Sequence, residues 1–313
     1  MIKQNNQKPL LSIVLVNHNA RKLTQHCIQS IYDKTKNTLI EIILVDNASL
    51  DGSAVCLKEK FPEIIIIQNI NNTGFAHANN QAIKISSGKY VMLLNNDTVL
   101  KNEALDKMIA FMDEDEEAAA LTCKLFNRDG VTIQRNCRTF PTPSGTMFGR
   151  ASLLTKLFPN NPWSSKNLLT DWDYNSAREI DWASGAALMV RRSVIDQVGL
   201  LDDKNFFIYW EDTDWCKRIH GAGWKIFFTP EAEIIHFTGS GGGRRSFLLS
   251  NLMIYQMHRS AYNYFRKHYF KSWLNPMTIS TFLGFVLLVS IKILLNSTKI
   301  LLRYFKHLFA LSR

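Results

Sequence analysis

The sequence predicts an α/β protein, with a mainly parallel central sheet, helices on both faces and a helical C-terminal tail. Three observations predict this fold. Short apolar runs alternate with helical stretches over the first half of the chain, which is the pattern of a parallel sheet. Polar and ionisable side chains directly follow several of those runs. Beyond Glu233 the chain has long apolar stretches and no acidic residue.

The elements of the first half follow one another at short intervals. Strands are predicted at 11–16, 41–45, 64–67 and 90–94, where β-branched and other apolar residues form short runs. Helices are predicted from about 21 to 32, from the loop 47–52 to about 60, and from 75 to 86. Strand and helix therefore alternate through four strands, as in a doubly wound sheet.

The second half is less regular. A buried run is predicted at 184–190, helices at 193–198 and 212–221, and a strand at 225–228. The apolar runs 206–210 and 234–235 are interpreted as strands that end at Glu211-Asp212 and at His236. Residues 125–180 contain four prolines and scattered aromatic residues, which indicates loops over the sheet that contact a substrate.

Length and composition set the broad class. A chain of 313 residues, 46% of them hydrophobic, is long enough for one large domain with an appendage, and we divide it into 1–245 and 246–313. Five scattered cysteines without a CxxC pair argue against a zinc cluster or a disulfide framework and fit a reducing compartment. Residues 1–8 are polar and do not resemble a signal segment, so a cytoplasmic catalytic body is expected.

The positive charge lies in the tail. Of the 37 basic residues, eleven follow Glu233, so residues 1–233 carry 26 basic and 27 acidic groups and sum to −1, although the whole chain is +10. A basic tail favours anionic lipid, nucleic acid or a diphosphate as its partner.

The tail also has the length and pattern for membrane attachment. Residues 273–291 carry no charge and approach the roughly 20 residues that a spanning helix needs. Residues 299–313 place apolar side chains against Lys299, Arg303 and Lys306, which is typical of a helix in the membrane interface. We expect attachment at the cytoplasmic face by helices lying in the interface. A true span, a buried helical hairpin and a dimer interface are the alternatives.

Asp97 follows the apolar run 90–94 and two asparagines. A carboxylate at the end of a strand can bind Mg²⁺ or Mn²⁺ that bridges two phosphates, although Asp and Asn also cap helices and form turns. Because ligands of open α/β sheets bind beyond the carboxyl ends of the strands, the functional interpretation of Asp97 is favoured.

Two further strand ends carry ionisable groups. Asp212 has Glu211 and Asp214 as neighbours, and clustered carboxylates can raise one pKa, which suits a general base. Helix N-terminal capping is the alternative for one of the three acids, but it explains all three less well. His236 precedes a glycine-rich stretch at 239–243 and Arg244-Arg245, which suits a loop that folds over phosphate. A structural histidine and a linker are the plain alternatives.

Asp46 ends the second strand, where a carboxylate can accept a hydrogen bond from a ribose hydroxyl or a base N–H. Asp51-Gly52, which follows in the loop, is explained in part by turn formation. The GxGxxG and GxxxxGK[ST] patterns are absent, which argues against a nicotinamide cofactor and a phosphate-loop nucleotidase. The GxSxG pattern of serine hydrolases is absent too.

Taken together, these segments resemble the family-2 glycosyltransferases, which have a Rossmann-like GT-A fold. The resemblance runs from about Leu11 to Thr238 and is carried by the segments 13–19, 45–53, 71–76, 94–97, 184–186 and 210–214, with Asn79-Asn80 and His236. It is closest to the rhamnosyltransferase-like branch, which builds cell-surface polysaccharides.

The resemblance implies a role for each site residue. Asp97 and His236 would bind Mg²⁺ or Mn²⁺, with Asn95 at the position where relatives carry the first carboxylate, and Asp212 would be the general base. The nucleotide-sugar donor would be bound by the strand-end and loop residues Val16, Asn17, Asp46, Asn72, Gly74 and Asn96. Gln256-Met257-His258-Arg259-Ser260 lacks the tryptophan of the processive QxxRW motif, so transfer of one or few sugars is expected.

The implied activity is an inverting, metal-dependent transfer of rhamnose from dTDP-rhamnose to a hydroxyl of a glycan or lipid-linked acceptor. A galactofuranosyl- or other hexosyltransferase that uses a UDP-sugar is the close alternative. A non-catalytic membrane-binding or nucleic-acid-binding protein is the remote one, and the apolar tail suits lipid better than a phosphate groove. We therefore expect no nucleic-acid partner, and a homo-oligomer is left open.

Overall fold

The computed structural model describes residues 8–143, 169, 171–237, 247–270, 272 and 276–311. The predicted glycine-rich loop 239–243, the pair Arg244-Arg245 and residues 144–168 of the predicted loops lie outside these ranges.

The first half of the sheet is parallel, as predicted. β1 (Leu11–Asn17), β2 (Ile40–Asn47), β3 (Ile65–Asn69) and β4 (Tyr90–Leu94) lie in the order β3-β2-β1-β4. Each pair of neighbours is parallel. The connections run through α1 (Arg21–Lys34), α2 (Ser53–Lys60) and α3 (Phe75–Ile85). All four carboxyl ends therefore reach the same edge of the sheet, which we call the rim.

The second half extends the sheet beyond β4 with mixed directions. β11 (Ala187–Arg191) lies antiparallel between β4 and β6 (Ala118–Phe126). β12 (Lys225–His236) pairs parallel with β6, and β5 (Thr98–Leu100) returns antiparallel beside β12. The short strands β7 (Ile133–Gln134) and β9 (Arg178–Glu179) pair with β6 and β12, while β8 (Cys137–Arg138) and β10 (Trp182–Ala183) form a separate pair. The long strands other than β11 share one direction, so the sheet is mainly parallel.

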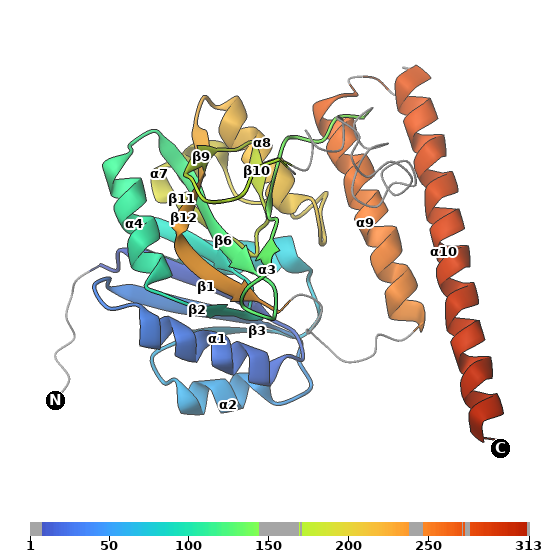
Figure 1. Ribbon diagram of the computed structural model, residues 1–313, viewed down its shortest axis with the longest axis horizontal. Coiled ribbons are helices and arrows are strands. Elements are labelled where there is room, and N and C mark those ends of the chain that lie inside the picture. The colour runs from blue at the N-terminus through green and yellow to red at the C-terminus, as the bar shows by residue number, and fades with distance from the viewer. Residues whose placement is uncertain are drawn as a thin grey trace.

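Helices cover both faces of the sheet (Figure 1). Side chains alternate along each strand, so Ile13 packs in one core cluster and Val14 in the other. The first cluster contains residues of α1, α2 and α4 (Ala104–Glu114). The second contains residues of α3, α7 (Arg192–Val198) and α8 (Glu211–Gly221). Because helices cover both faces of the sheet, polar side chains from different elements meet at the rim.

Two strand predictions were wrong. Residues 206–210 form no strand, because Tyr209 and Trp210 have φ values of 68° and 71°, which are incompatible with extended backbone. The runs at 225–228 and 234–235 belong to one strand, β12, which continues through Pro230 with a register shift between Thr229 and Glu233. A bulge of this kind is where a strand tolerates proline. α4 and β6 were not predicted.

The tail is helical, as predicted. α9 (Phe247–His268) and α10 (Pro276–Leu311) lie side by side, with α9 nearer the catalytic body (Figure 1). Among the described residues one helical stretch is long and apolar enough to cross a membrane, Thr278–Thr298, with a mean hydropathy of 2.2 and 6% of it buried. A buried hairpin therefore does not describe the stretch Thr278–Thr298, whose apolar side chains are largely exposed.

All five cysteines are free. Cys27, Cys123, Cys137 and Cys216 are buried in the two cores, and Cys56 on α2 is partly exposed.

Candidate active site

Asn17 and Asp46 lie next to each other at the rim, at the ends of β1 and β2. Asn17 Nδ2 donates hydrogen bonds to Asp46 Oδ1 at 2.9 Å and to Ser49 Oγ at 2.9 Å. The Ser49 hydroxyl donates to Asp46 as well. Asp46 is 5% exposed, and Val16 beside it is partly buried. These hydrogen bonds fix the Asp46 carboxylate within a cluster of polar side chains at the rim.

Asn96, which lies just after β4, belongs to the same polar cluster. Its Nδ2 donates to Asn17 Oδ1 at 3.1 Å and to Thr24 Oγ1 at 2.8 Å. Thr24 Oγ1 in turn donates to Asn17 Oδ1 at 2.8 Å. The structure thus brings Asn17, Asp46 and Asn96 together from three strands. Thr24 was not predicted from the sequence, although a polar residue on the buried face of a helix was the available signal.

Asn72 and Gly74 shape the loop between β3 and α3. Asn72 Oδ1 accepts hydrogen bonds from Gly74 N and from Asn47 Nδ2, both at 3.0 Å, so this oxygen closes the loop. Gly74 has a φ of +89°, and a Cβ there would lie 2.5 Å from the carbonyl oxygen of Phe207. Only glycine satisfies both conditions, and Phe75 N donates to the same carbonyl at 2.7 Å. The loop therefore rests against residues 206–210.

Asp97 and His236 meet at the junction of β5 and β12, where His236 pairs with Thr98. Asp97 Oδ1 lies 3.2 Å from His236 Nε2, and their side chains are 12% and 8% exposed. His236 Nδ1 lies 2.7 Å from Gln134 Oε1. Since an amide oxygen can only accept, His236 Nδ1 donates to Gln134 Oε1, and Nε2 is the ring nitrogen that faces Asp97.

This pair fits a divalent cation. A metal-binding imidazole typically donates its other ring N–H to an acceptor, and here Gln134 is that acceptor. No group of three or more His, Cys, Asp or Glu side chains suited to a metal occurs in the described part of the chain. Asp97 and His236 would therefore supply two ligands and leave positions for phosphate oxygens, as Mg²⁺ sites usually do.

Asp212 stands in the first turn of α8 beside the start of β11. Its Oδ2 accepts a hydrogen bond from Gly185 N at 2.9 Å, and its Oδ1 accepts from Thr213 N at 2.7 Å. Burial raises the pKa of Asp212, although hydrogen bonds from Gly185 and Thr213 oppose the shift. A carboxylate of raised pKa is a stronger base than an exposed one.

Glu211 has different surroundings. Burial, reinforced by the Asp212 charge, raises the pKa of Glu211 well above its usual range. Its Oε2 is buried without a hydrogen-bond partner among the described residues. The two neighbouring carboxyl groups therefore differ, since Asp212 accepts hydrogen bonds from Gly185 and Thr213 while burial and the Asp212 charge favour the neutral form of Glu211.

Short connections link the two ends of the site. Asn95 N donates to Ala186 O at 2.9 Å, and the adjacent Gly185 N donates to Asp212. Asn95 Nδ2 lies 3.2 Å from His236 Nε2. The Asp97 and Asp212 carboxylates therefore belong to one rim, separated by the start of β11. Asp214, grouped with them in the sequence, belongs elsewhere, since it is fully buried among cations from α8 and α9.

Known proteins resemble the chain in sequence and in fold. A model of the Glycosyl transferase family 2 matches residues 12–198, more than half of the chain. The N-acetylglucosaminyl-diphospho-decaprenol L-rhamnosyltransferase of Mycobacterium tuberculosis is 27% identical over 76% of this chain and 78% of its own length. A hexosyltransferase of low-salt glycan biosynthesis from Haloferax volcanii is 26% identical over 72% of this chain and 66% of its own length.

Among solved structures, the mannosyltransferase of Pyrobaculum calidifontis in complex with GDP-Man and Mn²⁺ superposes with a TM-score of 0.55. The match covers 94% of this chain and 74% of that one at 14% sequence identity, and shows that the two share the GT-A fold. Since the family model covers most of the catalytic body and the fold agrees, the chain belongs to glycosyltransferase family 2, on its rhamnosyltransferase-like side.

Proposed function

We propose that the chain transfers rhamnose from dTDP-rhamnose to a hydroxyl of a glycan or lipid-linked acceptor in cell-surface polysaccharide synthesis. The choice of sugar is supported by the 27% identity with a rhamnosyltransferase over three quarters of the chain. The observation that carries the mechanism is the joining of Asp97 and Asp212 to one rim through Asn95, Ala186 and Gly185.

The donor nucleoside would bind against Val16, Asn17, Asp46 and Asn96. Asp46 is held by Asn17, which suits an acceptor for ribose hydroxyl or base N–H groups. The loop that Asn72 closes and Gly74 shapes would form the wall of the donor site. In this arrangement the diphosphate extends along the rim toward Asp97.

Asp97 and His236 would hold Mg²⁺ or Mn²⁺ against the diphosphate. The metal, when bound, neutralises charge that develops on the departing nucleoside diphosphate. Asp97 and His236 would hold this metal, and Gln134 orients the imidazole by accepting a hydrogen bond from Nδ1.

Asp212 would accept the proton of the acceptor hydroxyl as its oxygen forms the new bond to the anomeric carbon. The bond from that carbon to the diphosphate breaks in the same step, and the proton moves from the hydroxyl to Asp212. Because attack comes from the face opposite the leaving group, the anomeric configuration inverts without a covalent intermediate. The Gly185 and Thr213 N–H groups fix the carboxylate for this transfer.

A second candidate is transfer of another hexose from a UDP-sugar, which the similarity to the Haloferax volcanii hexosyltransferase favours. Binding and hydrolysis of dTDP-rhamnose, UDP-galactofuranose, UDP-glucose and UDP-N-acetylglucosamine separate the two. Each donor is titrated with Mn²⁺ or Mg²⁺ into the wild type, Asp97→Ala and, as a control for net charge, Asp129→Ala, an exposed turn residue.

We expect metal-dependent binding of dTDP-rhamnose that is reduced at least about tenfold in Asp97→Ala and unchanged in Asp129→Ala. Preferred binding of a UDP-sugar would move the assignment to the second candidate. If folded wild-type protein bound none of the four donors, the assigned role of Asp97 would be wrong.

The proposed acceptor is lipid-linked, which would explain why a catalytic body carries an exposed apolar helix. On this proposal the enzyme works at the cytoplasmic face of the membrane, with α10 and the basic tail in contact with anionic lipid.

A further inference from the structure

The segment that presents Asp212 is strained. Residues 205–210, which we call the corner, lead into α8 without regular secondary structure. Within it Tyr209 and Trp210 adopt consecutive left-handed conformations, with φ values of 68° and 71°. Bulky residues adopt such conformations only where the surrounding structure holds them. Some other element must therefore hold the corner in place.

α9 holds the corner by hydrogen bonds. Ser260 Oγ donates to the carbonyl oxygen of Ile208 at 3.0 Å. Asn263 Nδ2 donates to the carbonyl oxygen of Asn205 at 2.7 Å. Both side chains thus satisfy backbone groups of a segment that has no sheet or helix to satisfy them.

α9 also holds the corner by packing. The Trp210 ring lies 5.2 Å from Tyr264 and 5.6 Å from Phe265, measured between ring centroids. Tyr264 and Phe265 are both 0% exposed, in a core cluster that also contains Phe206. This cluster joins the first and last residues of the apolar run 206–210 to one face of α9.

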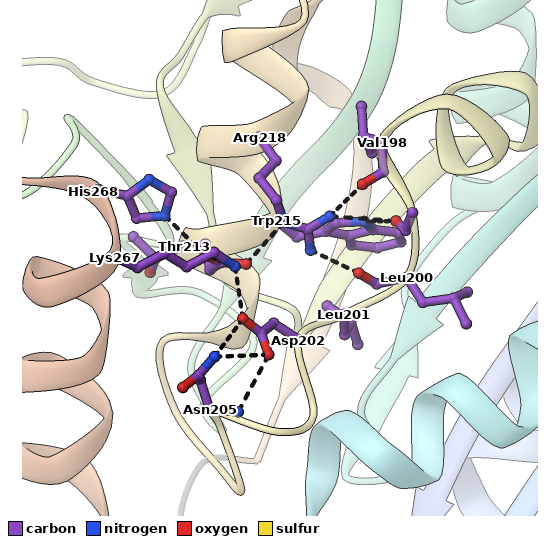
Figure 2. Close-up of polar contacts among 12 residues, drawn as sticks. Val198, Leu200, Leu201, Asp202, Asn205, Thr213, Trp215, Arg218, Lys267 and His268 are labelled. Atoms are coloured by element: carbon purple, nitrogen blue, oxygen red, sulfur yellow. Dashed lines mark hydrogen bonds and ion pairs between the residues drawn. The ribbon is translucent and has the colours of Figure 1, made fainter. Parts of the chain in front are cut away.

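A set of polar and charged side chains connects α9 to α8 directly. We call Asp214, Arg218, Lys267 and His268 the latch. Asp214 Oδ1 accepts from His268 Nε2 at 2.8 Å and lies 2.8 Å from Lys267 Nζ, while its Oδ2 accepts from Arg218 Nε at 2.9 Å. Lys267 also reaches Asp202 at 2.7 Å. Figure 2 shows Lys267 and His268 extending from α9 toward α8, beside Arg218.

The latch carboxylate is charged. Burial alone would raise the pKa of Asp214, but the His268 hydrogen bond and the Arg218 and Lys267 charges outweigh it and hold the pKa at about 2. A fully buried carboxylate whose partners come from two helices is costly to separate from them. Asp214 lies two residues after Asp212 in the first turn of α8, so the latch fixes the turn that carries the proposed base.

We propose that α9 is a positioning element of the active site, and that Lys267 and His268 hold the first turn of α8 so that Asp212 faces the acceptor. The proposal rests on the role of Asp212 given above. It assigns to the region 246–270 a function that membrane attachment does not explain. Since the residues proposed to bind the nucleoside lie at the ends of β1 and β2 and just after β4, away from the corner, the latch should affect transfer and leave nucleotide binding unchanged.

The test uses the full chain in detergent and three variants. Lys267→Ala with His268→Ala removes the α9 side of the latch. Lys267→Arg with His268→Gln keeps both hydrogen-bond donors. Arg259→Ala removes a positive charge from an exposed position of α9 and serves as the matched control. Hydrogen exchange over residues 205–214, affinity for dTDP and UDP with Mn²⁺, and the kcat of transfer are measured for each.

We expect the double alanine variant to exchange at least about tenfold faster over 205–214, to lose at least about tenfold in kcat, and to bind both nucleotides within about twofold of the wild type. The conservative pair should restore kcat to within about threefold, and Arg259→Ala should match the wild type. Unchanged exchange over 205–214, or faster exchange with unchanged kcat, would overturn the proposal.

Asp212→Asn separates this proposal from the function on which it rests. Full transfer activity in Asp212→Asn, with the latch intact, would remove Asp212 as the base and leave the exchange result for the latch standing as a separate finding. Loss of activity in Asp212→Asn, together with the expected behaviour of the latch variants, would support both.

Discussion

Glu211 and Asp212 are neighbours in the chain, but their carboxyl groups meet different surroundings. Asp212 receives N–H donors from Gly185 and Thr213, whereas Glu211 Oε2 is buried without a partner among the described residues. These surroundings favour the neutral form of Glu211, whereas the N–H donors at Asp212 favour its charged form, which suits Asp212 as the proposed base.

The raised pKa of Asp212 predicts the acid limb of the pH–rate profile. Because the base acts in its deprotonated form, kcat should rise with pH through a midpoint above the usual aspartate value of 3.8. The midpoint is measured from initial rates between about pH 4 and 9, with donor saturating. Asp212→Glu should retain an acid limb and Asp212→Asn should lose it; an unshifted limb in Asp212→Asn would assign the base to another group.

Glu211→Gln tests whether Glu211 is neutral. The folded-state pKa of Glu211 lies above the usual 4.5, so the folded state binds this proton more tightly than the unfolded state. The free energy of unfolding should therefore fall as pH rises above about 4.5 in the wild type, and fall less steeply in Glu211→Gln.

Denaturant unfolding at pH 5 and pH 8 measures this difference, with kcat as a second readout. Glu211→Gln should keep kcat at pH 7 within about threefold, because the amide reproduces a neutral carboxyl group. A loss of about a hundredfold or more would show that the Glu211 charge takes part in the reaction.

At the residue scale the sequence predicted strand-end groups and missed their partners. Asp46 and Asp97 each stand at or just after the end of an apolar run, so the local pattern singled them out, whereas Asn17 was named through the resemblance to family 2. Ser49 and Gln134 lie in segments without periodicity, and their contacts with Asp46 and His236 depend on how the sheet is assembled. Such pairs follow from tertiary structure and leave no local signal.

At the element scale, the loop before α3 shows how closely backbone segments approach around the site. Gly74 combines a left-handed backbone with a contact to Phe207 that leaves no room for a Cβ. This close approach places the proposed wall of the donor site directly against the corner that leads to Asp212.

Gly74→Ala should lower the free energy of unfolding by roughly 1 to 3 kcal/mol or more, because strain and a steric clash add. Gly223→Ala is the matched control, since Gly223 has a φ of +88° with no atom within 4 Å of the added Cβ. Gly223→Ala should lower the free energy of unfolding only by the cost of the strained backbone. Equal losses of stability in the two variants, by denaturant unfolding, would mean that the Phe207 contact is not a constraint.

Elements were predicted where the pattern was local and missed where it was not. β1, β2 and β4 each contain an apolar run of four or more residues, which the sequence shows directly. β6 contains three consecutive alanines after an acidic helix end, and alanine has low strand propensity. The aromatic run 206–210 has high strand propensity, but α9 holds it in another conformation, so tertiary contacts outweighed local preference.

On the scale of the whole molecule, the tail has two parts with different surroundings. α9 packs on the catalytic body through the corner and the latch. α10 packs on α9, partly through Asn296, whose Nδ2 donates to Asn251 Oδ1 at 2.7 Å, and exposes apolar side chains outward. We propose that α10 is the part that contacts the membrane.

A chain ending near residue 271 removes α10 and keeps α9. It should move from the membrane fraction to the soluble fraction, because the exposed apolar stretch Thr278–Thr298 is lost. It should also retain the hydrogen-exchange protection of residues 205–214, which α9 provides. Fractionation of cells that express either chain measures the first effect. A shortened chain that stays with membranes as fully as the intact one would show that α10 is not the anchor.

The cysteine distribution offers a reporter that needs no engineering. Burial raises the pKa of Cys27 and of Cys216 to about 12, which suppresses their reaction with thiol reagents, and Cys123 and Cys137 are buried as well. Cys56 is partly exposed on α2, which covers the sheet face opposite α8 (Figure 1). A fluorophore attached to the natural chain through a maleimide should therefore sit at Cys56, and energy transfer from it to labelled lipid would measure how far the catalytic body stands above the bilayer.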